Sequence, residues 1–518
     1  MAVGTILASL LLSVVSTERC GIVALNQDVT EMQYRLAPGE ENAAGVRKYF
    51  DSVSKGGLTH FLINPNAHNA GYASEVWDPV WHRDPRLKER PLKQFENSRV
   101  LHENGVDWVQ VMIDACREQG VSPWLSMRMN DIHSIGERYS WSNSKFWLDH
   151  PELRRKPGSE EGGAYSADLA FDFTHRAVRE HALALAREML GKWDVDGFEC
   201  DWLRFPHHVN DAAELDRTGC AALTEYMREM RRLADEAGRR RGKRLLVGVR
   251  VAAMPEAALG LGTDAVAWAR EGLVDWVAPC NFFSCLDFAL PFDEWKSRLA
   301  AANPNVRLVG GLDFAGVDRE GTGPRGVLTS EFCGYLERMT AAGVRDFECF
   351  NRFAYSEGEV NRYVQIEGMP DMGGWARRHD RSYPVTFHDA VPKGYDADRR
   401  LPTGLKDGRA FAVSVGRVGR ASSAGVVLAF DGIFDGDLAA CVTLNGASAV
   451  GARAEPLASW VPGARRAKSA YRVGFPVRAL RDGVNEIRLR PCPTGRKLHF
   501  ATLLVGKDEP GGSGAAMP

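Results

Sequence analysis

A short apolar run followed by a helical pattern recurs along the first 350 residues of this sequence. The strand-like runs occupy residues 20–28, 59–66, 121–131, 195–202, 244–252, 274–283, 306–314 and 344–353. Helical patterns follow seven of them, near residues 40–55, 103–119, 174–193, 211–240, 262–272, 291–302 and 329–342, and the helix after the eighth run is left open. Runs that are apolar on both faces and separated by helices are typical of buried parallel strands.

Eight such units predict an α/β fold, a closed (β/α)8 TIM barrel. A doubly wound open sheet is the alternative, and it is disfavoured because no glycine-rich phosphate turn follows the first strands. After about residue 380, short alternating runs separated by Gly, Asp and Asn predict a C-terminal antiparallel β-sandwich. We therefore predict a barrel over residues 1–375, a sandwich over 380–508 and a disordered tail over 509–518.

The overall composition excludes some classes of partner. A net charge of −2 argues against binding to nucleic acid or to an anionic membrane surface. The ten cysteines are scattered without metal-ligand spacing, so we expect mostly unpaired thiols. The apolar residues 1–20 resemble a signal peptide but lack its basic start and cleavage pattern, so a cytoplasmic and an exported protein both stay open. No other segment is long enough to span a membrane, and the oligomeric state is not predicted.

Polar residues gather where the predicted strands end, and this is the end that carries the chemistry of a (β/α)8 barrel. The N-terminal ends show no such concentration. The candidates for binding substrate are Asn64, Asn66, His68, Arg128, Asn130, Asp131, His133, Arg204, Arg250, Asn281 and Asn351. Side chains of these types bind hydroxyl and carboxylate groups, so the pattern predicts a carbohydrate substrate.

Two loops at the same end, residues 67–100 and 132–173, are far longer than usual and rich in aromatic residues. Trp77 and Trp141 are candidates for stacking on a sugar ring. The alternative is that these rings only seal the loops onto the barrel.

Hydrolysis of a glycosidic bond usually needs two carboxyl groups, one protonated and one ionised. Asp201, at the end of the fourth run, is the first candidate, and a nearby arginine could keep it ionised. The candidates for the second carboxyl are Asp313, Glu348 and Glu199. Each of these acids could instead form a buried ion pair that holds the barrel together. No HxH or HExxH pattern is present, so we predict no metal and no other cofactor.

The segment DGFECDWLRFP, residues 196–206, resembles the fourth strand of glycosyl-hydrolase-like family 10 barrels. It is more distantly similar to chitinase-like barrels, but Leu203 stands where those carry the catalytic acid. Residues 124–133 (WLSMRMNDIH) and 72–78 (YASEVWD) are similar to bacterial barrel proteins grouped as glycoside hydrolases. The resemblance implies a barrel that faces carbohydrate and retains Asp201, and it leaves the partner acid open.

The C-terminal part carries a second resemblance. VTLNG, residues 442–446, and the run at 470–490 are similar to galactose-binding-like sandwich modules of glycosidases. Together these observations predict a glycoside hydrolase acting on an oligo- or polysaccharide. Two alternatives are a non-catalytic carbohydrate-binding barrel, and a lyase or isomerase that uses Arg128, Arg250 and a histidine on an acidic sugar.

Overall fold

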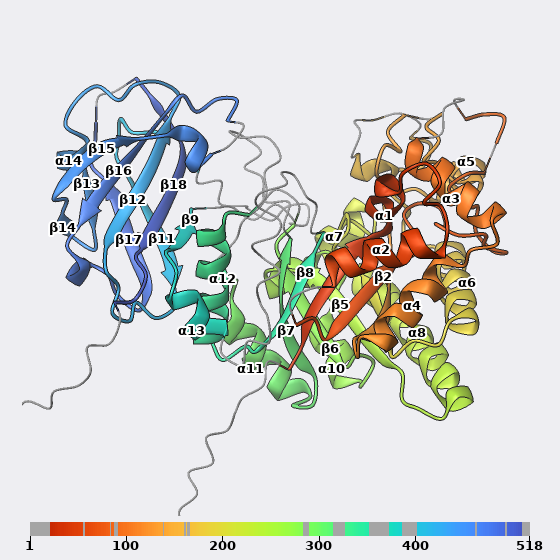
Figure 1. Ribbon diagram of the computed structural model, residues 1–518. Helices are drawn as coiled ribbons and strands as arrows, with labels where there is room; N and C mark the ends of the chain where they lie inside the picture. Colours follow the sequence, from red (N-terminus) through yellow and green to blue (C-terminus); the bar gives the residue numbers. More distant parts are fainter. Residues whose placement is uncertain are drawn as a thin grey trace, which may run out of the picture.

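The computed structural model describes residues 21–509 with internal gaps. The gaps are residues 55–56, 83, 88–91, 138, 160–161, 163–165, 283–289, 314–326, 352–371, 386–400, 462–463 and 493–494. Two bodies are visible in Figure 1, a barrel and a sandwich, with helices α12 and α13 between them. The predicted barrel limit at residue 375 falls inside α13 (Met372–Arg377), and the predicted sandwich start at residue 380 falls just before β9 (Arg381–Pro384).

Eight parallel strands close into a barrel in chain order, and β1 pairs with β8. They are β1 (Val23–Asp28), β2 (His60–Asn64), β3 (Ser122–Arg128), β4 (Gly197–Asp201), β5 (Leu246–Ala252), β6 (Trp276–Cys280), β7 (Arg307–Asp313) and β8 (Asp346–Phe350). Each strand lies inside one of the eight predicted runs. The predicted (β/α)8 barrel is thus confirmed, and the pairing of β1 with β8 excludes the open sheet.

Helices surround the barrel and are more numerous than the sequence predicts. They are α1 (Val29–Arg35), α2 (Ala43–Val53), α3 (Lys93–Glu103), α4 (Trp108–Glu118), α5 (Lys145–Asp149), α6 (Arg176–Lys192), α7 (Asp211–Asp216), α8 (Gly219–Arg241), α9 (Pro255–Gly260), α10 (Ala265–Arg270), α11 (Phe292–Ala302), α12 (Thr329–Ala341) and α13 (Met372–Arg377). Helix α3 falls largely within the segment predicted to be a long loop, so part of that loop is ordered as a helix.

Local polar residues define where several helices begin and end. The side chains of Asn42, Asp107 and Asp264 accept backbone N–H bonds at the starts of α2, α4 and α10. These bonds satisfy donors that the first turn of a helix cannot pair internally. At the end of α8, Gly242 has a φ of 67°, a left-handed conformation that glycine adopts without a steric penalty.

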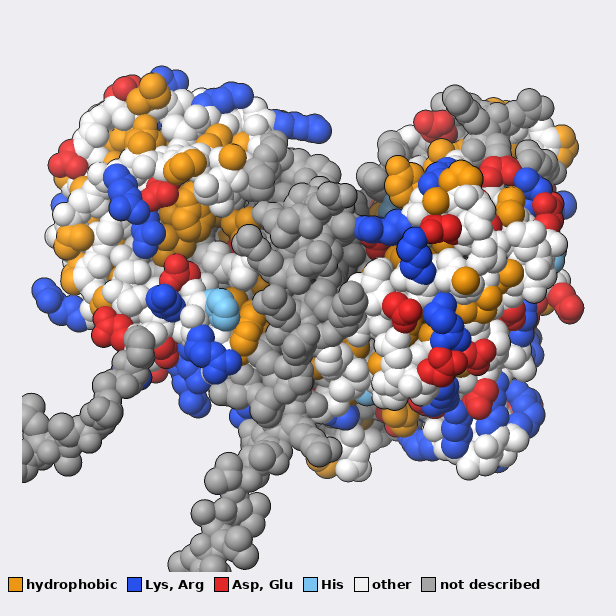
Figure 2. Space-filling model, viewed as in Figure 1, with side chains coloured by type: hydrophobic (Ala, Val, Ile, Leu, Met, Phe, Trp, Pro, Cys, Tyr) orange, Lys and Arg blue, Asp and Glu red, His pale blue; other side chains and the backbone are white. Residues whose placement is uncertain are grey.

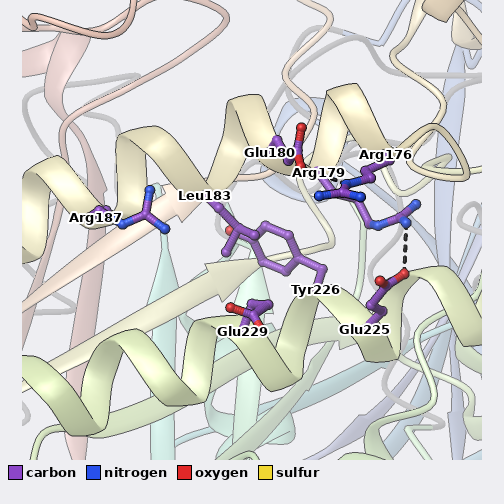
Figure 3. Close-up of a pocket in the computed structure, with 8 residues that line it drawn as sticks. All are labelled: Arg176, Arg179, Glu180, Leu183, Arg187, Glu225, Tyr226 and Glu229. Atoms are coloured by element: carbon purple, nitrogen blue, oxygen red, sulfur yellow. Dashed lines mark hydrogen bonds and ion pairs between the residues drawn. The ribbon is translucent and has the colours of Figure 1, made fainter.

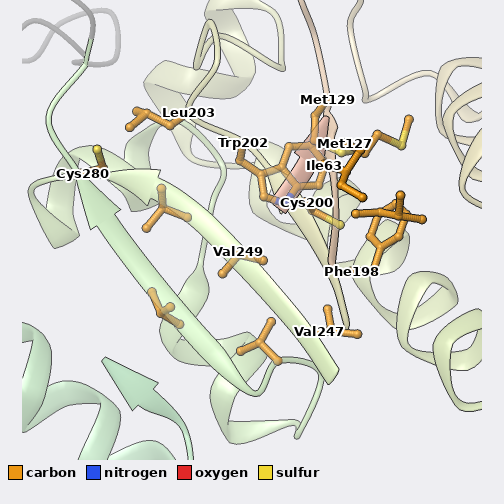
Figure 4. Packing of buried hydrophobic residues seen from close by; sticks show 14 of the residues in the cluster. Ile63, Met127, Met129, Phe198, Cys200, Trp202, Leu203, Val247, Val249 and Cys280 are labelled. Atoms are coloured by element: carbon orange, nitrogen blue, oxygen red, sulfur yellow. The ribbon is translucent and has the colours of Figure 1, made fainter. Parts of the chain in front are cut away.

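The outward faces of the strands pack under the helices. Phe198 and Cys200 of β4 lie beside Val247 and Val249 of β5 in this layer (Figure 4), and all four are fully buried. Because side chains alternate along a strand, Glu199 and Asp201 must point the other way, into the barrel. Burial of a large apolar side chain contributes roughly 1.5–3 kcal/mol, so this outer layer is a main source of stability.

Two tryptophans fill the amino-terminal half of the barrel interior. The indole rings of Trp124 and Trp276 stack with their centroids 3.9 Å apart and their planes 5° apart. Glycines make room for them: a Cβ on Gly197 would lie 2.2 Å from Trp124, and one on Gly248 would lie 1.9 Å from Trp276. This end of the barrel is therefore a packed apolar plug.

A sandwich of two antiparallel sheets follows the barrel, as predicted. One sheet has the order β10–β18–β12–β16–β15 with β9 also on β18, and the other has the order β11–β17–β13–β14. The strands are β9 (Arg381–Pro384), β10 (Thr403–Gly404), β11 (Arg409–Val415), β12 (Ala424–Phe430), β13 (Val442–Leu444), β14 (Ala447–Ser448), β15 (Gly451–Glu455), β16 (Ser469–Phe475), β17 (Gly483–Leu489) and β18 (Lys497–Val505). The sandwich has a hydrophobic core of its own.

One buried acid of helix α12 joins the barrel to the sandwich. The carboxylate of Glu337 accepts a hydrogen bond from the hydroxyl of Tyr383 at 3.2 Å and one from the backbone N–H of Arg417 at 2.6 Å. Both donors belong to the sandwich side of the chain, so these bonds help to fix the sandwich against α12. The predicted tail lies almost wholly outside the described residues.

None of the helices in the described ranges is long and apolar enough to cross a membrane. The eight cysteines that the structure describes are all free thiols, and Cys441 and Cys492 lie closest, with their sulfur atoms 3.3 Å apart.

Candidate active site

The carboxyl ends of the barrel strands form a polar mouth above the tryptophan plug. The strand register aligns Asp28 with Asn64, Arg128 with Asp201, and Asp201 with Arg250. Since residues at equal register on neighbouring strands share a face, these side chains all point into the upper half of the barrel. The sequence prediction that polar groups converge at this end therefore agrees with the strand positions.

Asp201 is held by three donors at the end of β4. Its Oδ2 lies 2.8 Å from Nη2 of Arg250, and its Oδ1 accepts the backbone N–H groups of Leu203 at 3.1 Å and Arg204 at 3.0 Å. The side chain of Asp201 is 0% exposed and that of Arg250 is 1% exposed. Three donors therefore fix the orientation of this carboxyl group.

Arg250 is itself fixed from two sides. Its guanidinium lies 3.5 Å from the centroid of the Phe350 ring, and it is paired with Asp201. Burial opposes the charged form, but the neighbouring Asp201 carboxylate outweighs it and raises the pKa of Arg250. The Asp201–Arg250 pair is therefore a buried ion pair, which is one of the alternatives that the sequence left open.

Glu199 and Glu348 form a carboxyl pair one layer below Asp201. Asn26 donates from Nδ2 to Oε1 of Glu199 at 2.7 Å and to Oε1 of Glu348 at 3.2 Å, and Ser126 donates to Glu199 at 2.9 Å. The two carboxyl groups are also close enough to influence each other's protonation. Burial raises the pKa of both acids, and the charge of Glu348 raises that of Glu199 further. The buried pair therefore retains a proton more readily than two exposed glutamates would.

Asp313 stands at the end of β7 and is 1% exposed as a residue. Its backbone N–H donates to Oδ1 of Asn281 at 3.2 Å, which joins the ends of β6 and β7. Burial and Arg128 lower the pKa of Arg204, and the carboxylate of Asp313 opposes this effect. Asp313 therefore lies within electrostatic reach of the Arg204 side of the mouth.

A chain of alternating charges crosses the mouth from β1 to the segment after β4. Arg128 lies 2.6 Å from Asp28 and 2.8 Å from Asp131. His133 Nδ1 lies 2.6 Å from Asp131, and His133 Nε2 lies 2.7 Å from Nη2 of Arg204. Since a guanidinium can only donate, Nε2 must accept and Nδ1 must carry the hydrogen. Burial and Arg204 lower the pKa of His133, in agreement with this neutral form.

A cavity of about 210 Å³ opens beside this row of charged side chains, at the ends of β1 to β3. Its polar side includes Asp28, Arg128, Asp131, His133 and His68. Its apolar side includes Val80, Leu92, Phe95 and Trp141, and the rings of Phe95 and Trp141 lie 4.2 Å apart. One wall is therefore polar and the other aromatic, an arrangement that suits a small ligand with hydroxyl groups and an apolar face.

Several predicted binding residues are occupied by backbone contacts instead. Asn64 donates to the carbonyl of Ser126 at 2.7 Å, and Asn66 both donates to and accepts from the backbone of Arg128. Asn130 makes the same two-way contact with Phe171. These amides position the loops around the mouth.

Two further candidates have structural contacts. Asn351 has a φ of 49°, and its side chain accepts the backbone N–H of Asp28 at 3.1 Å. His68 Nδ1 contacts the carbonyl of Asp131 at 3.1 Å, and its ring stacks on Phe171. Burial lowers the pKa of His68 to about 4, so this ring is neutral near pH 7.

The two predicted tryptophans lie in different places. Trp141 lines the cavity, whereas Trp77 stacks on His181 of α6 at 4.6 Å and donates from Nε1 to the carbonyl of the same residue. Trp77 thus seals its loop onto the outer ring of helices. The sequence reasoning missed Asp28 and Phe95. Asp28 ends the first strand-like run and could have been found by the rule that identified the others, whereas Phe95 carries no such signal.

A second hollow lies outside the mouth, between α6 and α8 (Figure 3). Its volume is about 640 Å³, and its walls carry both signs of charge, including an ion pair of 2.7 Å between Arg179 and Glu225. Its charges largely face one another across the two helices, and it contains none of the predicted site residues. In the described part of the chain, no group of three or more His, Cys, Asp or Glu is placed to hold a metal ion.

No family model matches the sequence, and no curated protein matches it. Solved structures with a similar fold include a cycloisomaltooligosaccharide glucanotransferase from Paenibacillus sp., at 10% identity over 94% of this chain and 57% of that one, with a TM-score of 0.36. Another is the glycoside hydrolase domain of PgaB (BpsB) from Bordetella bronchiseptica, at 11% identity over 68% and 99%, with a TM-score of 0.42.

A third is the GH36 α-galactosidase AgaB from Geobacillus stearothermophilus, at 11% identity over 89% of this chain and 56% of that one, with a TM-score of 0.37. This chain thus spans little more than half the length of the glucanotransferase and of the galactosidase. Similarities at this level of identity and TM-score do not identify the function, which has to be inferred from the residues of the mouth.

Proposed function

We propose that this protein is a glycoside hydrolase that cleaves an oligo- or polysaccharide at the mouth of its barrel. The observation that carries the proposal is the position of Asp201. It ends the fourth strand on the interior face, and three donors stabilise its carboxylate. In this proposal Asp201 is the ionised carboxyl group, and Asp313 on β7 is the second one.

Glu199 and Glu348 have a supporting role in this proposal. Both are 0% exposed, and each is engaged by the other and by Asn26. A substrate that entered from the mouth would meet the layer of Asp201 and Arg250 first. We therefore assign the second carboxyl to Asp313 and regard the glutamate pair as the floor beneath the reacting groups.

The cavity beside Asp28 and Trp141 supports a saccharide substrate. Its aromatic wall can stack on the C–H face of a sugar ring, and its carboxylates and His133 can bind hydroxyl groups. The resemblance of residues 196–206 to glycosyl-hydrolase-like family 10 barrels agrees with this proposal. So does the resemblance of the C-terminal part to galactose-binding-like modules.

The test is a screen of oligo- and polysaccharides for released reducing ends, with Asp201→Asn and Asp196→Asn compared. Asp196 is a matched control because it precedes the same strand at the opposite end of the barrel, where it pairs with Arg117 and Lys243. We expect Asp201→Asn to lose about 10³-fold or more in kcat, and Asp196→Asn to retain its turnover. Circular dichroism must show that both variants are folded. A folded Asp201→Asn variant with full turnover would disprove the assignment.

The burial of the Asp201–Arg250 pair favours one alternative, a barrel that binds carbohydrate without cleaving it. In that case Asp201 is a structural ion-pair partner, no glycan is hydrolysed, and Asp201→Asn binds saccharide as well as the wild type. A lyase or isomerase is less favoured, because Arg128 and Arg250 are already paired with carboxylates of the protein.

A further inference from the structure

The outer face of the sandwich carries a groove of about 620 Å³ near the ends of β12, β15 and β16. Its lining includes Ser423, Val450, Gly451, Arg453, Arg472 and Gly474, and we call this feature the sandwich groove. Its strands belong to the six-stranded sheet of the sandwich.

Two arginines stand directly opposite each other in the sandwich groove. Arg453 of β15 pairs in register with Arg472 of β16, so their side chains share one face of the sheet. Like charges at directly opposed positions of an antiparallel pair are destabilising. The only acid that contacts them among the described residues is Glu455, which lies 3.0 Å from Arg453 on the same strand. The side chain of Arg472 has no hydrogen-bond or ion-pair partner in the described ranges. Arg472 thus presents positive charge that the described residues do not neutralise, and Arg453 is paired only with the acid on its own strand.

The floor beside the arginines is open at Gly451. Gly451 of β15 pairs with Gly474 of β16. This glycine pair lies two residues along each strand from Arg453 and Arg472, so it is on the same face of the sheet. A Cβ on Gly451 would meet no atom within 4 Å. At the rim, Val450 is 74% exposed and Val477 is 37% exposed, so apolar surface flanks the charge.

The charge of the whole C-terminal region agrees with this local feature. Residues 401–509 contain sixteen Lys and Arg but nine Asp and Glu, although the complete chain has a net charge of −2. Lys and Arg side chains are spread over the sandwich on the face shown in Figure 2. A polyanion would therefore be attracted to the sandwich before it contacted the groove.

We propose that the sandwich groove binds an acidic polysaccharide, a polyuronate, through its carboxylates. Arginine forms strong, charge-assisted and often bidentate hydrogen bonds with carboxylates. The open glycine floor and the exposed valines would receive the apolar face of a sugar ring. This site goes beyond the proposed hydrolase, because it binds without cleaving and lies on a separate sheet.

The test is affinity electrophoresis of the full chain through native gels that contain polygalacturonate, neutral dextran or dextran sulfate. We expect polygalacturonate to retard the protein, and Arg472→Gln or Arg453→Gln to weaken the apparent affinity about tenfold. Gly451→Leu should weaken it as well, because its side chain fills the groove while both charges stay. Arg488→Gln is the matched control, because it removes the same charge from the other sheet, where Arg488 pairs with Glu486.

Several results would overturn the proposal. Equal retardation by dextran shows that carboxylates are not recognised, and equal or stronger retardation by dextran sulfate indicates a general polyanion surface. An equal loss in Arg488→Gln shows that only net charge matters, and an unchanged Gly451→Leu shows that the groove is not the site. Thermal unfolding confirms that each variant is folded. Because binding is measured with Asp201→Asn as well, failure of the hydrolase proposal leaves this test intact.

Discussion

The two halves of the barrel interior are built in opposite ways. The amino-terminal half holds the stacked indoles of Trp124 and Trp276, seated on Gly197 and Gly248. The carboxyl-terminal half holds ionisable groups, among them the buried Asp201 paired with Arg250. Both halves are lined by the same eight strands, so the difference lies in the side chains alone.

The apolar packing that stabilises the barrel and the ionisable groups therefore lie at opposite ends of the barrel axis. In the amino-terminal half, which we call the lower half, apolar rings fill the space that the glycines leave. Removal of these rings from water stabilises the fold directly. In the upper half, each charge must be matched by an opposite charge or by a hydrogen bond, because an unmatched buried charge is costly. Changes in the lower half should therefore alter stability alone, whereas changes in the upper half should alter stability, proton binding and activity together.

Arg250→Met should have the largest effect on stability. It leaves the carboxylate of Asp201 buried without its cation, while methionine keeps the apolar contact with Phe350. Breaking a buried ion pair from one side costs about 3–5 kcal/mol in the free energy of unfolding. Urea denaturation measures this loss.

The double variant Asp201→Asn/Arg250→Met sharpens the comparison, because it removes both charges at once. We expect it to recover most of the stability that Arg250→Met loses, and to stay inactive. If the double variant regains turnover, Asp201 is only a structural partner of Arg250. If Arg250→Met costs less than about 1 kcal/mol, the pair is not buried as the structure shows.

Gly248→Ala tests the lower half. Its Cβ would lie 1.9 Å from Nε1 of Trp276, whose ring cannot move freely because it stacks on Trp124. Overpacking of this kind costs about 1–3 kcal/mol of unfolding free energy, and turnover below the melting transition should not change. Gly191→Ala is the control, because a Cβ there meets nothing within 4 Å in helix α6, and it should gain up to about 1 kcal/mol. Equal effects of the two variants would argue against the tryptophan plug.

The Glu199–Glu348 pair predicts a dependence of stability on pH. Burial, then the charge of Glu348, raises the pKa of Glu199 above its ordinary value of 4.5, so the folded state retains a proton that the unfolded state releases. The contribution is therefore complete below about pH 4.5, and it is lost as the pH rises through the folded-state pKa. One such proton changes the free energy of unfolding by at most about 1.4 kcal/mol per pH unit.

Glu199→Gln imitates the protonated acid and should flatten this slope between pH 5 and 8, as measured by urea denaturation at each pH. Glu225→Gln is a suitable control, because Glu225 is largely exposed on α8 and lies outside the barrel. Some slope should persist in the variant, since burial also raises the pKa of Glu337 at the sandwich junction. An unchanged slope would show that the glutamate pair does not share a proton.

The positions of the eight strands were predictable because buried parallel strands are apolar on both faces. The helices were less predictable, as α3 shows. Its buried positions are Phe95, Asn97, Ser98 and Leu101, so half of the face that it buries is polar and no hydrophobic period marks it. Tertiary contacts, such as the bonds from Asn97 to the carbonyls of Gln33 and Leu36, fix this helix instead.

The site was predictable as a set of residues but not as a set of partners. Strand alternation places Glu199 and Asp201 on one face, and the structure agrees. Their environments depend on Glu348 and Arg250, which lie 149 and 49 residues away from them along the chain. Only the closure of the barrel brings these groups together, so their protonation and pairing cannot be deduced from local sequence. For the same reason the predicted roles of Trp77 and Trp141 could not be distinguished.

These two tryptophans allow the smallest of the predicted effects to be tested. Trp141→Ala removes part of the aromatic wall of the cavity, so it should raise KM about fivefold, or about 1 kcal/mol, with little change in kcat. Trp77→Ala should leave KM unchanged and lower the melting temperature, because that ring packs on His181 outside the mouth. Michaelis–Menten kinetics on the best substrate of the screen, together with thermal unfolding, measure both. If Trp77→Ala raises KM as much as Trp141→Ala, the substrate extends over the outer loops, and the boundary between the chemical and structural parts of the barrel lies further out than this mouth.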